Sequence, residues 1–128
     1  MRAWMVMGAA LALAPMGGAL AQDAEAGQRV YNQCRACHTI NAGGRNGVGP
    51  NLHGFWGRRA GQVQGFRYSA NMMQLAEQGL TWDEATLRRY LTNPKDVVPN
   101  GSMAFNGIRN EQQLNDLLAY LQRASSAQ

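Results

Sequence analysis

Two cysteines and a histidine stand close together in Cys34-Arg35-Ala36-Cys37-His38, a C-x-x-C-H pattern. This is the spacing of c-type haem attachment, in which two thiols form thioethers with one porphyrin and the histidine binds its iron. The chain holds 2 cysteines in total, so no thiol is left for another role. We therefore expect one covalent haem c, attached through Cys34 and Cys37, with His38 as a ligand of its iron.

A C-x-x-C pair has other uses: a dithiol redox site, half of a zinc site or a plain disulfide. A zinc ribbon needs a second C-x-x-C pair or two suitably spaced histidines, and the sequence has neither. A thioredoxin-like site expects a βαβ pattern, and no strand-like alternation surrounds this motif. Haem attachment is the interpretation we adopt, and a redox dithiol is the main alternative.

The second axial ligand of such an iron decides between an electron carrier and a catalyst. The candidates are His53, Met72, Met73 and Met103, or an open position. His53 follows His38 so closely that the chain would have to cross the porphyrin edge within a short span. Met72 and Met73 fall in an expected helix, where methionine more often fills the core. Met103 lies in an irregular loop between two expected helices, so the residues favour it while leaving the other candidates open.

Helices are needed to position these residues, and apolar periodicity predicts three. They cover residues 24–34, the segment from Thr81 to Asn93-Pro94, and the segment after Asn110. A shorter helix is expected over residues 70–77. The expected start signals are Asp23 and Asn110 as N-caps and Thr81-Trp82-Asp83-Glu84 as a capping box.

The stretch from His38 to Ser69 has a different character, because it is rich in glycine and has almost no periodic apolar pattern. So long an irregular segment is unusual in a small domain unless it wraps a large rigid ligand. Burying on the order of 500 Å² of haem surface gives roughly 12 kcal/mol. That equals the whole net stability of a typical domain, about 5–15 kcal/mol. We therefore expect the chain without haem to be largely unfolded.

Residues 1–21 have the features of a cleaved export signal. Arg2 precedes an apolar run, and Ala19-Leu20-Ala21 forms an A-x-A cleavage site. The run is shorter than the roughly 20 apolar residues of a membrane span, although retention as an uncleaved anchor stays an alternative. Cleavage leaves one domain, residues 22–128, expected in the periplasm. Loss of Arg2 lowers the formal charge by one from +4, and basicity this mild gives no support for nucleic-acid binding.

Several further blocks stand in the order typical of one family, and with them the mature chain resembles class I cytochromes c of the mitochondrial and soluble bacterial type. The blocks are Cys34 to Thr39, Gly49 to Gly54, Gly57 to Gly61, Gly65 to Ser69, Thr81-Trp82, Tyr90-Leu91, Asn93 to Lys95, and Pro99 to Ile108. The resemblance implies an all-α fold with three main helices, one or two short helices, and Gly-rich loops wrapped around one covalent haem.

The resemblance also implies roles for single residues. His38 and Met103 would be the axial ligands of the iron, and Cys34 and Cys37 would form the thioethers. The other residues implied at the haem are Pro50, whose carbonyl accepts the His38 ring proton; Arg58, Tyr68 and Trp82, at the propionates; Tyr90, near the Met103 sulfur; and Phe105, beside the exposed haem edge. Gly27, Tyr31, Leu117 and Tyr120 would form the crossing of the first and last helices.

The function implied is a monomeric, soluble, periplasmic one-electron carrier rather than an enzyme. Its implied partners are redox proteins that dock transiently at the haem edge: a membrane cytochrome complex, a terminal oxidase or a photosynthetic reaction centre. An alternative is a dedicated electron-accepting subunit of a periplasmic dehydrogenase.

Two departures from the family pattern bear on these roles. Gly101 lacks a hydroxyl that usually helps hold a propionate. Gln33 and Ser102 stand where lysines are common, and Lys95, Arg35 and Arg88 or Arg89 remain as substitutes. Electrostatic steering towards an acidic partner should therefore be weaker.

Overall fold

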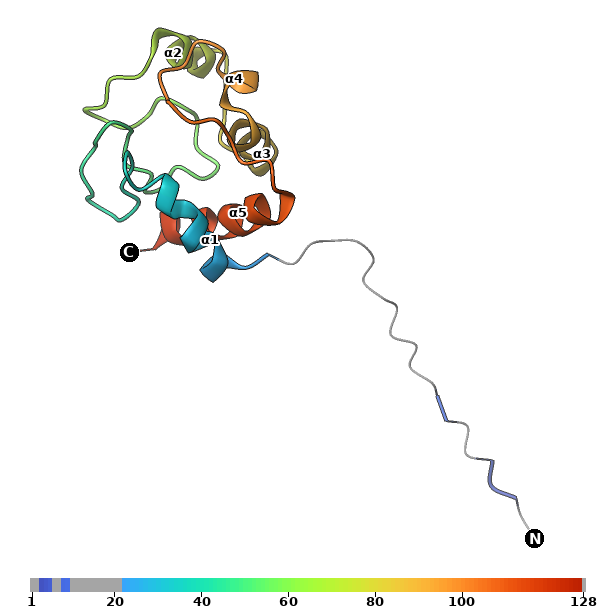
Figure 1. The fold of residues 1–128 in the computed structure, drawn as a ribbon. Coiled ribbons are helices and arrows are strands. Elements are labelled where there is room, and N and C mark those ends of the chain that lie inside the picture. The colour runs from blue at the N-terminus through green and yellow to red at the C-terminus, as the bar shows by residue number, and fades with distance from the viewer. Residues whose placement is uncertain (1–2, 6–7, 10–21, 128) are drawn as a thin grey trace.

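The fold is a set of helices at the periphery, joined by long loops that run around the centre of the molecule (Figure 1). It is a computed structural model that describes residues 3–5, 8–9 and 22–127. The elements are α1 (Ala24–Val30), the 3₁₀ helix η1 (Tyr31–Gln33), α2 (Ala70–Glu77), α3 (Glu84–Thr92), α4 (Pro94–Val97) and α5 (Glu111–Ser126).

The expected all-α fold class is confirmed: α1 continued by η1, α3 and α5 correspond to the three expected main helices, and α2 and α4 to the short ones. Within the described ranges there is no β-strand, and Arg59 and Thr81 form an isolated antiparallel bridge. No helix in those ranges is long and apolar enough to cross a membrane. The expected leader, residues 1–21, lies outside the described residues except for 3–5 and 8–9.

The first and last helices pack directly on each other, as expected (Figure 1). The Tyr31 and Tyr120 rings lie 5.2 Å apart between centroids, and Leu117 is fully buried. Gly27 lies against α5 so closely that a Cβ there would be 2.8 Å from Tyr120 Cβ and would overlap the Asp116 carbonyl. The backbone of α1 thus approaches α5 at a distance that only glycine permits.

We expect Gly27→Ala to destabilise the haem-loaded protein by about 3 kcal/mol, because the methyl group must push two helix backbones apart. In an ordinary helix the same change would be stabilising by up to about 1 kcal/mol, so the sign of the effect is diagnostic. Urea unfolding followed by circular dichroism measures it. The control is Gln28→Ala, on the exposed side of α1, which should leave the free energy of unfolding nearly unchanged. Equal effects of the two changes would contradict this account of the crossing.

The predicted helix over residues 24–34 is correct in position but changes type before its end. Asp23 caps it as expected, accepting hydrogen bonds from the backbone N–H of Glu25 at 3.0 Å and of Ala26 at 3.1 Å. After Val30 the turns tighten to 3₁₀ geometry, and the Cys34 N–H donates to the Tyr31 carbonyl at 2.8 Å. The C-x-x-C-H motif therefore begins directly after this helical segment, which fixes the position and direction of the backbone at Cys34.

The expected capping box at Thr81 is wrong, because Asp83 is the N-cap of α3. Its carboxylate accepts the Thr86 N–H at 2.8 Å, which lowers the pKa of that carboxyl group. Thr81 lies instead in the bridge with Arg59, where its backbone is extended. A local helix-start signal is here overridden by pairing with a segment distant in sequence. Asn110 does cap α5, accepting the Gln113 N–H at 2.9 Å.

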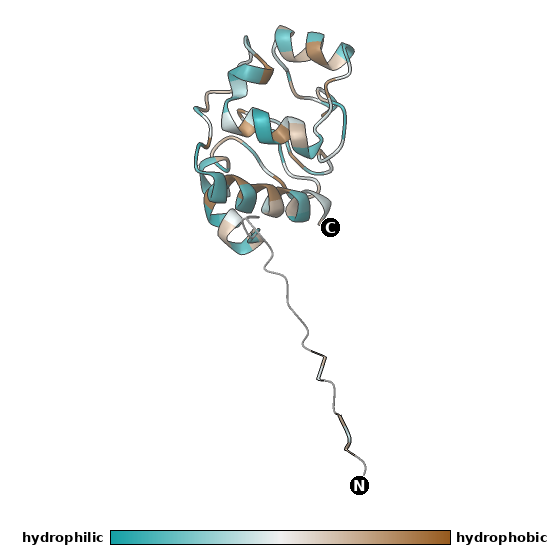
Figure 2. Ribbon diagram, turned by 90° about the vertical axis from the view of Figure 1, so that its right-hand side faces the viewer, coloured by the Kyte–Doolittle hydropathy of each residue, from teal (hydrophilic) through white to brown (hydrophobic). Residues whose placement is uncertain are grey.

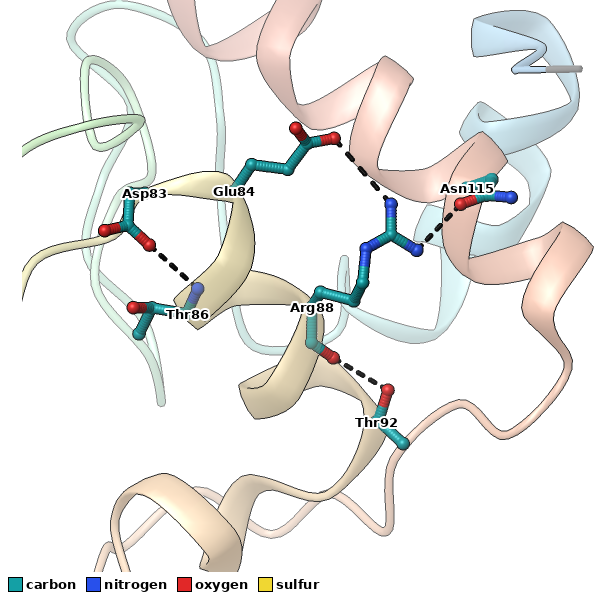
Figure 3. A network of polar contacts seen from close by, with 6 residues as sticks. All are labelled: Asp83, Glu84, Thr86, Arg88, Thr92 and Asn115. Atoms are coloured by element: carbon teal, nitrogen blue, oxygen red, sulfur yellow. Dashed lines mark hydrogen bonds and ion pairs between the residues drawn. The ribbon is translucent and has the colours of Figure 1, made fainter. Parts of the chain in front are cut away.

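The side chain of Arg88 adds a polar contact between α3 and α5 (Figure 3). Its guanidinium donates to Asn115 Oδ1 at 2.8 Å and lies 3.7 Å from the Glu84 carboxylate. Hydrophilic and hydrophobic residues alternate along the longer helices, as expected where one face of a helix meets the core (Figure 2). The core cluster joins η1, α3, α5 and two loop residues, and the α1 residues Ala24 and Val30 pack against it; its buried members are Tyr31, Phe55, Leu87, Leu91, Ile108, Leu114, Leu117, Leu118, Tyr120 and Leu121.

Candidate functional site

A cavity of about 230 Å³ lies within the ring of loops and reaches the inner sides of α3 and α5. Its lining includes all ten residues that the sequence places at the haem: Cys34, Cys37, His38, Pro50, Arg58, Tyr68, Trp82, Tyr90, Met103 and Phe105. These residues come from segments spread over most of the domain. The fold therefore brings together the whole predicted set around one space.

The size of this cavity indicates that it is made for a large occupant. At roughly 24 cal/mol per Å³, leaving it unfilled would cost about 5 kcal/mol. That is as much as the lower end of the total stability of a domain, about 5–15 kcal/mol. Its lining is dominated by apolar side chains such as Leu52, Phe55, Leu87 and Leu121. A flat, mostly apolar group with a few polar substituents fits this lining.

The two cysteines lie at this cavity as free thiols, so the plain-disulfide interpretation is not supported. Burial raises the pKa of the Cys34 thiol to about 11, which keeps it protonated at neutral pH. A zinc site is not supported either, because no group of three or more His, Cys, Asp or Glu side chains that could hold a metal occurs in the part of the chain that is described. What remains is a pair of thiols that line a mostly apolar cavity of about 230 Å³.

His38 is held in one orientation by its neighbours. Its Nδ1 lies 2.8 Å from the Pro50 carbonyl oxygen, which can only accept, so Nδ1 carries the proton. Burial lowers the pKa of the ring, partly offset by the bond to Pro50, so the imidazole is neutral. A neutral ring with a protonated Nδ1 leaves the Nε2 lone pair for a metal, as is usual for a histidine ligand. The Tyr31 hydroxyl fixes the adjoining backbone by donating to the His38 carbonyl at 3.2 Å.

Gly49 packs directly against the His38 ring, and it is a site residue that the sequence did not reveal. A Cβ at this position would lie 2.7 Å from both nitrogens of the His38 ring. The available signal was its place directly before Pro50, the residue that accepts the ring proton. The imidazole is therefore sandwiched between the backbone of Gly49 and the cavity.

We expect Gly49→Ala to destabilise the haem-loaded protein by about 3 kcal/mol, since the added methyl must displace the His38 ring. The displacement lengthens the bond from Nδ1 to Pro50. Guanidinium unfolding followed by circular dichroism measures the loss. Gly43→Ala is the matched control, because it adds a methyl to the same loop with nothing within 4 Å. Its cost is that of a positive φ alone, about 1 kcal/mol. Similar losses in the two variants would argue against the close packing on His38.

The structure separates the four candidates for the second axial ligand. Met103 and Met72 both line the cavity, whereas neither His53 nor Met73 is among its described lining residues. Met73 has 41% of its surface exposed and lies near Gly61. Met103 is partly buried, and its sulfur accepts a hydrogen bond from the Tyr90 hydroxyl at 3.7 Å. Two thioethers therefore remain, and Met103 is the one with a polar partner at its sulfur.

The residues expected at the propionates are held next to one another by backbone hydrogen bonds. The Trp82 N–H donates to the Arg58 carbonyl at 2.9 Å, and the Gly57 N–H donates to the Trp82 carbonyl at 2.8 Å. The Tyr68 hydroxyl accepts the Val63 N–H at 3.0 Å, and burial raises its pKa. Arg59, which sequence reasoning did not single out, lines the same wall as Arg58. One side of the cavity thus combines two guanidinium groups with a phenol and an indole, donors suited to carboxylates.

The part of the cavity beside Trp82 and Tyr90 is aromatic. The Trp82 and Tyr90 rings lie 4.8 Å apart between centroids, and burial raises the pKa of the Tyr90 phenol to about 12. Phe105 packs against the core cluster from the loop that carries Met103. These side chains stay neutral at physiological pH and keep water away from the inner cavity.

Comparison with known proteins gives consistent matches over this whole region. A family model described as cytochrome c matches residues 24–125, a range that contains every residue of the cavity lining. Cytochrome c2 of Rhodoblastus acidophilus is 49% identical over 102 residues, covering 79% of this chain and 92% of that protein. Cytochrome c2 of Blastochloris viridis is 41% identical over 120 residues, covering 93% of this chain and 91% of that protein. Cytochrome c of Gibberella zeae is 41% identical over 100 residues, covering 77% and 92% of the two chains.

Proposed function

The chain belongs to the cytochrome c family, and from that premise we propose that it is a soluble periplasmic one-electron carrier whose haem iron is held by His38 and Met103. Family membership gives the cofactor, one covalent haem c, and electron transport as its use. Haem c, when bound, supplies an iron that exchanges single electrons between its ferrous and ferric states. The observation that supports the axial pair is that an oriented imidazole and a hydrogen-bonded thioether line the same cavity.

The other residues of the site act by orienting and shielding. Pro50 holds the Nδ1 proton of His38, which fixes the ring and strengthens it as a ligand. Arg58, Tyr68 and Trp82 would bind the propionate groups of the haem, and the apolar lining would exclude water from its iron. A dry pocket disfavours the extra charge of the ferric state, and a methionine ligand favours the ferrous state, so both raise the reduction potential. With His38 and Met103 as ligands, no position on the iron would be left for a substrate, which supports an electron carrier rather than an enzyme.

The surface charges support docking that depends only weakly on salt. Of the cations considered as substitutes for absent lysines, Arg88 is engaged with Glu84 and Asn115, and Arg35 lies 5.7 Å from the centre of the Tyr31 ring. Arg89 in α3, which donates to the Asp96 carbonyl at 3.5 Å, and Lys95 in α4 are both exposed and can meet an acidic partner. Few steering charges suit a transient complex with a membrane cytochrome complex, a terminal oxidase or a photosynthetic reaction centre.

The proposed location of the protein in the periplasm depends on its expected leader, residues 1–21. We propose that residues 1–21 are removed on export, leaving residues 22–128 as a single haem-binding domain. Mass spectrometry of the protein isolated from the periplasm should then give a mature chain that begins at Gln22 and carries one haem.

A redox titration of the purified protein tests the proposed function. We expect one reversible one-electron wave, a ferrous form that does not bind carbon monoxide, and elution as a monomer free of other subunits. Rapid binding of carbon monoxide would overturn the carrier proposal in favour of a catalyst or gas sensor. Stable co-purification with a dehydrogenase would favour the electron-accepting subunit instead.

A further inference from the structure

The loop that carries Met103 is fixed firmly at its two ends. Val98, at the end of α4, is buried, and Ile108 is buried while its N–H donates to the Leu91 carbonyl at 2.7 Å. Between these anchors, residues 99–102 and Ala104 are exposed to solvent. An exposed segment of this kind opens more readily than the helices beside it. The position of Met103 therefore depends on whatever contacts the loop makes on its way to the cavity.

One such contact comes from α2, on the far side of the loop. Asn71, in the first turn of α2, accepts the backbone N–H of Asn100 through Oδ1 at 2.8 Å. The bond joins residues 29 positions apart and meets the loop three residues before Met103. Helix α2 and the loop that leaves α4 lie at the same end of the molecule (Figure 1). The loop is thus held from the side opposite to its attachment on α3.

The first turn of α2, which carries Asn71, is itself fixed by an N-cap. Ser69 caps α2 by accepting the Met72 N–H at 3.0 Å, which fixes the turn on which Asn71 stands. Met72, the next residue, lines the cavity. The same turn therefore forms part of the cavity wall and holds the loop that completes it.

We propose that Asn71 is a positioning residue for Met103: its side chain holds the loop shut and so keeps the thioether in place against competing ligands. This inference rests on the proposed role of Met103 as an axial ligand. An external ligand can reach the iron only when the loop opens, so its apparent affinity is proportional to the fraction of open protein. Loss of one hydrogen bond raises that fraction about two- to tenfold.

Imidazole titration of the ferric haem-loaded protein tests the proposal. Asn71→Leu removes the acceptor at similar size, and we expect imidazole to bind about two- to tenfold more tightly than to the wild type. Asn71→Asp keeps an acceptor oxygen and should restore affinity close to the wild-type value. Asn100→Ala is the matched control, because only the backbone N–H of Asn100 takes part in the bond. It should bind imidazole as the wild type does.

Two outcomes would overturn the role of Asn71: an unchanged imidazole affinity in Asn71→Leu, or an equal change in Asn100→Ala. Urea unfolding of the same variants separates positioning from stability, since a merely structural role would lower global stability without changing imidazole affinity. Failure of the proposed function is distinguishable. It would show as a wild-type ferric protein that lacks the sulfur-to-iron absorption band in the red region before any imidazole is added.

Discussion

Replacing both cysteines with serine is expected to leave the chain without covalent haem and without most of its native helical structure. The cavity is central to the fold, and leaving it unfilled costs about 5 kcal/mol. The loss of roughly 12 kcal/mol from buried haem surface is larger still. The two figures describe the same empty space, and the larger alone matches the net stability of a typical domain, about 5–15 kcal/mol. Far-ultraviolet circular dichroism of the purified Cys34→Ser/Cys37→Ser variant should show mostly unfolded chain.

The single variants provide the control for this experiment. Each keeps one thioether position and His38, so haem that is attached once should restore most of the helical signal. A double variant that keeps the native spectrum and unfolds cooperatively would show that the loops around the cavity fold without the cofactor. In that case the cavity would not be central to the stability of the fold.

Replacing Met103 with leucine is expected to open one axial position of the iron. Leucine has a similar volume but no sulfur, so the cavity stays filled while the ligand is lost. The ferrous protein should then bind carbon monoxide. The reduction potential should fall by on the order of 0.1–0.3 V, a part of the roughly 0.8 V range that axial ligands span. The direction follows because a thioether favours the ferrous state.

Met72→Leu is the matched control for that change, since Met72 lines the same cavity. It should leave both the potential and the lack of carbon monoxide binding nearly unchanged. A fall in potential of the same size in the two variants would mean that the effect comes from cavity packing. A fall in Met72→Leu alone would assign the ligand to Met72.

Local signals predicted the helices well wherever their ends are set by neighbouring residues. The short helix expected over residues 70–77 has those bounds, and Asp23 and Asn110 are the N-caps of α1 and α5. The capping box predicted at Thr81 is wrong because backbone pairing with Arg59, which is distant in sequence, decides the conformation of Thr81. The resemblance implied a second short helix, but no local signal placed α4, because a single turn after Asn93 leaves no periodic pattern to detect.

The haem site shows the same difference between local patterns, which the sequence reveals, and contacts between distant residues, which it does not. The motif blocks identified ten residues that the fold brings to one cavity, because each block has a recognisable local pattern. Close approaches and long-range contacts left no such pattern. The packing of Gly49 on the His38 ring and the bond from Asn71 to Asn100 became visible only in three dimensions. Arg88, considered as a docking residue from its charge, is engaged in holding α3 to α5.

His38 and Met103 are proposed as the two protein ligands of the haem iron. Red-region absorption of the ferric protein tests this assignment most directly, because a weak band there reports a sulfur–iron bond. We expect the band in the wild type and in Met72→Leu and its complete absence in Met103→Leu. Its survival in Met103→Leu, or its absence from the wild type, would contradict the assignment.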